Sequence, residues 1–407
     1  MRILVFAHGL VLALAALTGQ VTVAATLADA IGAALQIEQQ ESRVGALRDE
    51  SAAVRRQAAQ LIASNPSLRG KSVSASPPGS LGTYEQEALL DLPLWMPGQP
   101  GARRAVAASL GNQADALLRL LRWEMAGRVR EAAWTTALAQ GRLQQAMAAL
   151  ASARSLELAI GKRSSAGELA RKDLLMARQD TLAREVDRQA AQLDYDRAIQ
   201  TYIHLTGLRT LPNPLVETVV AQAGGDAELP ANHPRLVSGD SAVAQAQAER
   251  ERVRSDRLGH PILSVGGKRV RDGRGTEATD ALQLEINIPL AMPSQSAPAL
   301  AGAERSYTEQ VTTRQRTRLE IELTLQTARL EVSGAAAALE VAIRRQVVTQ
   351  DAYKLVRRGF DLGESDLAIM LQAQERAQQA SLNLELRRLE QGRAFARLNQ
   401  AQGSVPE

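Results

Sequence analysis

Two short segments of the chain alternate strictly between apolar and polar positions. Residues 84–94 place Leu90, Leu92 and Leu94 on one face and charged side chains on the other. Residues 280–290 place five aliphatic side chains on one face and polar ones on the other. Alternation with a period of two predicts a β-strand that has one apolar face. Weaker alternation precedes each of them and predicts two further strands, at 67–76 and 262–272.

Much longer segments repeat apolar residues at steps of three and four, which is the period of an α-helix. One such stripe runs through residues 99–160 and another through residues 299–358. At about 1.5 Å per residue each helix approaches ~90 Å, a length that no compact domain needs. Both stripes are narrow and rich in alanine, which favours close packing between helices. Shorter helices are predicted at 27–64, 168–205, 233–258 and 364–402, with turns at 161–167 and 359–363.

The same pattern occurs twice along the chain. Residues 90–97 and 286–293 lie 196 positions apart and both end in Pro-Leu-x-Met-Pro. The pairs Gly167-Glu168 and Gly363-Glu364 have the same offset. Several segments in one register indicate an internal duplication. We therefore expect a first repeat at 26–208, a linker at 209–232, a second repeat at 233–403 and a tail at 404–407.

Each half thus contains a helix, two strands, a long helix, a turn and a returning helix. The chain is mainly α with a small β portion, and it supplies two long helical hairpins and four strands. Four strands are too few for a membrane barrel, because the smallest barrels have eight. Open strand edges are not tolerated in lipid. If these strands meet a membrane, several chains must assemble.

Composition narrows the class of protein. Residues 1–25 have a charged start, an apolar stretch and a small-residue site at Ala25, which predicts a cleaved signal peptide. No cysteine is present, which excludes disulfides, thiolate metal sites and catalytic thiols. The formal net charge is only +4 and both signs are interspersed, so a nucleic-acid surface is not indicated.

Residues for catalysis or cofactor binding are missing from the sequence pattern. Four scattered histidines form no spacing typical of a metal site, and no nucleophile motif or phosphate loop is present. Abundant glutamates lie on solvated helix faces. We expect no enzyme activity, no cofactor and no bound metal.

This arrangement resembles the TolC-like outer-membrane efflux proteins, over residues 27–403. The residues that carry the resemblance are the duplicated strand ending in Pro-Leu-x-Met-Pro, the Asn/His-Pro-x-Leu approach to the first strand of each half, and the turn at 360–367. The resemblance implies a homotrimer, in which a twelve-stranded β-barrel in outer-membrane lipid continues into a twelve-helix α-barrel in the periplasm. It also implies passive export with an inner-membrane pump and a periplasmic adaptor. The turn is closest to the heavy-metal branch, whose pumps are of the resistance-nodulation-division (RND) type.

Members of this family commonly carry aspartates that ring the pore at the periplasmic tip. Transferred to this chain, those positions fall at Ile369 and Gln372, and in the first half at Asp173 and Met176. Asp173 is either a pore carboxylate or a solvated helix residue, and Ile369 is a candidate apolar constriction. Asp366 is a further tip candidate and could form ion pairs with nearby basic residues, although such surface pairs are weak.

Two other sets of residues have a functional and a structural interpretation. Lys162, Arg163, Arg357 and Arg358 either dock an adaptor hairpin or compensate the helix dipole at C-terminal ends. The aromatic pair at the two ends of the second strand either anchors the membrane interface or packs as ordinary aromatic side chains; these residues are Tyr84 and Trp95.

Two hypotheses of function remain. The first is an outer-membrane exit duct. The second is a periplasmic adaptor or scaffold whose hairpins bridge other proteins and whose strands form a small soluble sandwich. Two hairpins and few strands favour the duct, whereas the weak alternation at 67–76 and 262–272 favours the scaffold.

Overall fold

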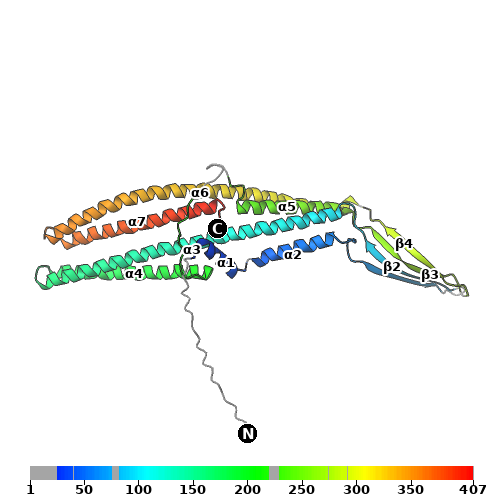
Figure 1. The fold of residues 1–407 in the computed structure, drawn as a ribbon, viewed down its shortest axis with the longest axis horizontal. Coiled ribbons are helices and arrows are strands. Elements are labelled where there is room, and N and C mark those ends of the chain that lie inside the picture. The colour runs from blue at the N-terminus through cyan, green and yellow to red at the C-terminus, as the bar shows by residue number, and fades with distance from the viewer. Residues whose placement is uncertain are drawn as a thin grey trace, which may run out of the picture.

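The computed structural model describes residues 25–39, 41–75, 82–219, 229–273, 275–290 and 292–406. Figure 1 shows an elongated molecule, with long helices side by side at one end and a β-sheet at the other. The signal peptide expected at 1–25 lies outside the described residues, apart from Ala25. Mainly helical architecture with one small sheet is therefore confirmed.

Two helical hairpins make up most of the length. The first consists of α3 (Gln99–Ser165) and α4 (Arg171–Thr206), and the second of α6 (Pro293–Asp361) and α7 (Leu367–Ala401). The sequence pattern predicted both pairs, but α3 continues past residue 160 and α6 begins before residue 299. Proline in the first turn of α6 explains the early start, because the missing N–H would have no partner there.

Both hairpins turn through the same backbone motif. Gly167 and Gly363 have φ angles of 82° and 81°, a conformation that glycine adopts without steric cost. The amide of the following residue, Glu168 or Glu364, donates to a carbonyl five positions earlier at 2.9 or 2.8 Å. This bond ends a helix in the Schellman manner. The offset of 196 residues therefore holds for individual hydrogen bonds.

The helices form one layer that is open at both edges. Near the turns, α3 packs between α4 and α7, and α7 packs against α6 (Figure 1). Nearer the sheet, α3 packs against α2 (Glu41–Ala58) and α5 (Pro234–Ser255), and α5 packs against α6. Helices α2 and α4 therefore lie at one edge of the layer and α6 lies at the other.

The single helix predicted at 27–64 is wrong, because the structure divides it into α1 (Leu27–Ile37) and α2. Gln39, between them, has a φ of 49°. At 3.6 residues per turn, the buried residues of α1 and those of α2 would lie on different sides of one straight helix. A break lets both sets pack. In the second half, α5 leads directly into the short helix η1 (Asp256–Leu258), which precedes β3.

The four strands form one antiparallel sheet in the order β1-β2-β3-β4. The strands are β1 (Ser67–Ala75), β2 (Thr83–Pro93), β3 (Ile262–Arg271) and β4 (Thr279–Asn287). The predicted strand at 280–290 is too long at its end, because residues 288–290 lie outside β4. Pairing of β2 with β3 joins the two halves of the chain, while β1 and β4 each have one unpaired edge.

The register gives the sheet two different faces. One row places Leu68, Leu90, Val265 and Leu284 side by side. The next row along the strands, Ser67–Asp91–Ser264–Glu285, is on the opposite face and is polar. On the apolar face, Leu282 is 97% exposed and Leu284 is 73% exposed. A monomer in water does not leave such an apolar face uncovered.

Part of the predicted linker crosses the groove between the two hairpins. Leu211 and Leu215 pack in one cluster with Trp134 of α3 and with residues of α7. Glu217 accepts two hydrogen bonds from the guanidinium of Arg130, at 2.8 and 2.7 Å, and Arg130 is almost fully buried. The linker therefore fixes α3 against α7 midway along the molecule.

His233 lies beside this crossing, at the start of α5. Its side chain is 2% exposed, its Nδ1 accepts from the backbone N–H of Arg235 at 3.2 Å, and its ring packs edge-on against Trp123. Burial, with a smaller contribution from the charge of Arg235, lowers the pKa of His233 to about 4. The imidazole is therefore neutral in the folded chain at neutral pH.

This burial predicts acid sensitivity. Because the pKa of His233 is lower in the folded state than in the unfolded state, the stability it contributes is complete above pH ~6.5. The free energy of unfolding should fall between pH ~6.5 and ~4, by up to about 1.4 kcal/mol per pH unit. His233→Asn keeps a helix-capping acceptor that does not titrate, so it should flatten this slope in thermal unfolding followed by circular dichroism. The exposed His204, changed to Asn, is the control; equal slopes in both variants would contradict the assignment.

Candidate functional site

The tips of the two hairpins pack together in one apolar cluster. Ile160 and Ala177 come from the first hairpin, and Phe360, Leu367 and Met370 come from the second. Across the same junction, the guanidinium of Arg163 lies 5.4 Å from the ring centroid of Phe360. The end of the helical layer is thus held together by contacts between the two repeats.

Asp173 has a structural partner at this tip. It is 9% exposed, and its Oδ2 accepts from the backbone N–H of Ala170 at 3.2 Å. The carboxylate therefore caps the first turn of α4, where N–H groups have no partner within the helix. Met176 packs at the margin of the apolar cluster. A pore position for Asp173 and Met176 stays a prediction.

The tip candidates of the second hairpin lie on the exposed side of α7. Ile369 is 54% exposed, and Asp366 and Gln372 are exposed on the same side at helical spacing. Asp366 begins α7 without a side-chain capping bond. Within the described ranges, Asp366 forms no ion pair with Arg171 or Lys172, the two basic residues at the start of α4. This side of α7 therefore combines an apolar residue with uncommitted polar residues.

The four basic docking candidates differ in their contacts. Arg163 bridges the two hairpins and also pairs with Glu168 at 3.1 Å, so it is committed to the tip itself. Arg357 donates to the hydroxyl of Tyr353 at 3.1 Å. Lys162 and Arg358 are exposed, and in the part of the chain that the structure describes they have no carboxylate partner. Those two are the residues that remain available to a partner protein.

The two membrane-interface candidates are at opposite ends of β2. Tyr84 lies on the apolar face of the sheet and donates to Gln86. Trp95 lies where the sheet meets the helices; its Nε1 donates to the carbonyl of Gln60 at 2.8 Å, and the guanidinium of Arg103 stacks on its ring. Trp95 is thus a packed junction residue, and the sequence pattern did not indicate these contacts.

Both edge helices expose a second apolar stripe. On α6, the side opposite α7 carries Leu319, Leu323, Leu330, Val341, Val348 and Leu355, which are between 56% and 72% exposed. On α4, the side opposite α3 carries Leu175, Leu182, Val186 and Leu193, which are between 50% and 64% exposed. Stripes of this length on soluble helices normally pack against another helix. The layer therefore has an unfilled packing surface at each edge.

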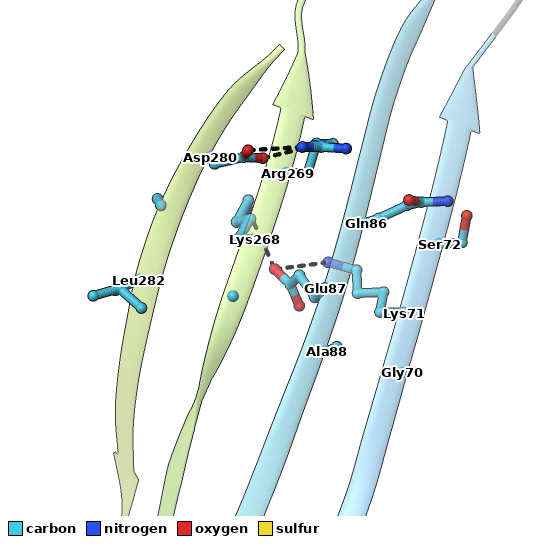
Figure 2. A pocket seen from close by; sticks show the side chains of 12 residues that line it. Gly70, Lys71, Ser72, Gln86, Glu87, Ala88, Lys268, Arg269, Asp280 and Leu282 are labelled. Carbon is cyan, nitrogen blue, oxygen red and sulfur yellow. Dashed lines mark hydrogen bonds and ion pairs between the residues drawn. The ribbon is translucent and has the colours of Figure 1, made fainter.

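Charged side chains fill the polar face of the sheet. Lys268 pairs with Glu85 at 2.9 Å and with Glu87 at 3.3 Å, and Lys71 pairs with Glu85 at 3.0 Å. Figure 2 shows Lys71, Glu87 and Lys268 together on neighbouring strands. A hollow of about 770 Å³ lies against the middle of the sheet, and most of the residues that line it, such as Gly70 and Leu282, belong to the rows of the apolar face.

None of the helices within the described ranges combines the length and the apolarity needed to cross a membrane. Within the same ranges, no group of three or more His, Cys, Asp or Glu residues is arranged to hold a metal ion.

The capping contact at the tip leads to a prediction. Asp173→Ala should remove the hydrogen bond that this carboxylate, at the third position of α4, accepts from the N–H of the N-cap residue Ala170, at a cost of about 1 kcal/mol. Amide hydrogen exchange at 170–176 should then accelerate about five-fold. Asp366→Ala removes a carboxylate that caps nothing and is the matched control for α7. Equal acceleration in the two variants would contradict the capping assignment.

No protein-family model matches the chain, and a search of curated proteins finds no match. Solved structures do match over most of its length. A membrane protein from Pseudomonas aeruginosa has a TM-score of 0.73 at 15% identity, covering 93% of this chain and 90% of that one. The outer membrane protein VceC from Vibrio cholerae has a TM-score of 0.70 at 17% identity, covering 94% and 97%. The outer membrane channel CmeC of Campylobacter jejuni has a TM-score of 0.67 at 13% identity, covering 93% and 85%. The chain therefore has the fold of these membrane proteins, two of which are outer-membrane proteins, as the TolC-like sequence resemblance implied.

Proposed function

We propose that the protein is the outer-membrane exit duct of a tripartite efflux system. Three copies close a twelve-stranded barrel in outer-membrane lipid and a twelve-helix tunnel in the periplasm. The chain reaches the outer membrane after cleavage of a signal peptide near Ala25. It is not an enzyme but a passive conduit for small molecules or metal ions.

The observation that carries this proposal is the pair of open edges. β1 and α4 lie along one edge of the chain, and β4 and α6 lie along the other. Each edge offers unpaired backbone groups in the sheet and an apolar stripe in the helices. A neighbouring copy that places its β4–α6 edge against β1–α4 satisfies both. Contacts of this head-to-tail type generate a closed ring when the rotation permits.

The two faces of the sheet support the assignment of inside and outside. The apolar face, with Leu68, Leu282 and Leu284 highly exposed, matches the lipid side of a membrane barrel. The polar face, with its lysine–glutamate network, matches a water-filled interior. Tyr84 and Trp95 then lie near the two membrane interfaces.

The tip then faces the periplasm and meets the partners. Ile369, Gln372 and Asp366 line the closing end of the tunnel, with Ile369 as an apolar constriction. Lys162 and Arg358 bind a helical hairpin of the periplasmic adaptor. The adaptor joins the duct to an RND-type inner-membrane pump. The heavy-metal branch indicated by residues 360–367 stays a prediction.

The adaptor or scaffold hypothesis requires a soluble β-sandwich. The described strands instead form one sheet, whose apolar face has no second sheet against it. This favours the duct.

Fractionation and conductance test the proposal directly. The protein should stay with outer membranes after salt and carbonate washing, and the purified protein should form ion-conducting channels in planar bilayers. Ile369→Ala should raise conductance, because it widens the constriction. Release by washing, together with no conductance, would support the scaffold hypothesis instead.

Assembly depends on the apolar stripe of α6. Leu330→Glu places a charge where a neighbouring copy is expected, and it forfeits about 2 kcal/mol of apolar burial per copy. Mass photometry in detergent should show monomers in place of trimers. Thr324→Glu adds the same charge at an exposed position of α6 outside the stripe, and it should leave the trimer intact. Trimers in both variants would exclude α6 from the interface.

A further inference from the structure

The sheet carries two similar arginine–aspartate pairs on opposite faces. On the polar face, Arg69 Nε and Nη2 bind the carboxylate of Asp91 at 3.2 and 2.9 Å. On the apolar face, Arg269 Nε and Nη2 bind the carboxylate of Asp280 at 2.6 and 2.7 Å, and Figure 2 shows this pair across β3 and β4. Both pairs use the two-point geometry that gives arginine its specificity for carboxylates.

Arg69 does more than pair with one aspartate. Its Nη2 also donates to Ser264 Oγ at 3.0 Å, and its Nη1 lies 3.9 Å from a carboxylate oxygen of Glu285. Ser264 in turn donates to Asp91 at 2.5 Å. The side chain therefore begins on β1 and contacts residues of β2, β3 and β4. It covers the width of the polar face contributed by one chain.

The row of side chains that contains Arg69 leaves room for this side chain to extend across the sheet. Arg69 pairs in register with Leu89 and, beyond it, with Gly266. Leu89 is 1% exposed and lies beneath the charged residues. Any side chain at Gly266 would overlap the carbonyl oxygen of Ala88, so this position has no bulk above the sheet. Gln283, the β4 residue of the row, has a buried Oε1 without a hydrogen-bond partner in the described structure.

The charges of this layer do not balance. Arg69 carries one positive charge, while Asp91 and Glu285 carry two negative ones, so each copy contributes one excess negative charge. In a pore, rings of charged side chains attract ions of opposite sign. Removing Arg69 would double that excess, from one to two negative charges per copy, without adding a carboxylate. At the tip, the lining residues proposed above include one carboxylate, Asp366, beside the uncharged Ile369 and Gln372.

We infer that Arg69 sets the charge selectivity of the pore at the level of the sheet, by neutralising carboxylates that would otherwise make the duct strongly cation-selective. The inference rests on the proposed function, because it takes the polar face as the pore wall. It concerns which cargo passes: with Arg69 present, cations are favoured only weakly and anionic cargo is not excluded.

Reversal potentials in planar bilayers under a KCl gradient test this inference. Arg69→Gln should raise the ratio of K⁺ to Cl⁻ permeability about two-fold or more. Glu285→Gln should shift the ratio the other way, and Arg69→Lys should keep the wild-type ratio. Arg269→Gln is the matched control: it breaks the same kind of pair in the same sheet but on the lipid side, so the ratio should not change. Mass photometry first establishes that each variant is assembled.

The outcomes separate the two levels of the argument. Wild-type protein that forms no channels would overturn the proposed function and the inference with it. Channels whose permeability ratio is the same for wild type, Arg69→Gln and Glu285→Gln would overturn the inference alone. An equal shift for Arg69→Gln and Arg269→Gln would also overturn it, because selectivity would then not depend on the face of the sheet. If Arg69→Gln does not assemble, the opposite shift expected for Glu285→Gln still decides.

Discussion

Backbone groups at the outer edges of β1 and β4 have no strand partner among the described residues, and the rest of the architecture depends on satisfying them. In lipid each unpaired group costs several kcal/mol, so an open sheet edge is not viable. The helical layer is incomplete in a similar way, because α4 and α6 each expose a stripe of apolar side chains. One neighbouring copy can remedy both only if sheet and helices close through the same rotation. Strand register and helix packing are therefore coupled over the whole length of the molecule.

The two halves are alike in their turns and different in the middle. Both hairpins end in the same glycine-based motif, but among the residues that the structure describes only the first half begins with a helix such as α1, and the linker after α4 packs beside α7. At that crossing, Arg130 and Glu217 form a largely buried ion pair. Because of this asymmetry, the two edges of the chain are not equivalent. Unlike edges favour a ring built head to tail, whereas like edges would favour a two-fold dimer.

Periodic patterns in the sequence predicted the hairpins, the sheet and the apolar and polar faces of β2 and β4. The break at Gln39 was not predictable, because neither glycine nor proline marks it; it follows from where α1 and α2 must pack. At the tip, the sequence placed Asp173 correctly on α4, but only coordinates reveal that its carboxylate caps the helix. The reach of Arg69 across four strands is likewise invisible in sequence, because it depends on a neighbouring glycine and on strand order. Local periodicity thus determines elements, while long-range register determines the partners of individual side chains.

Pairing between β2 and β3 has a consequence for how the protein is made. These strands are adjacent in space, yet the whole first hairpin and the linker separate them along the polypeptide. When synthesis has produced the first repeat, β2 still lacks a neighbour on one side and exposes an aggregation-prone edge. Non-local pairing of this kind is slow. Until more than 260 residues are available, the unpaired edge of β2 therefore stays exposed, and a factor that binds the unfolded chain, as holdase chaperones do, would keep it from aggregating.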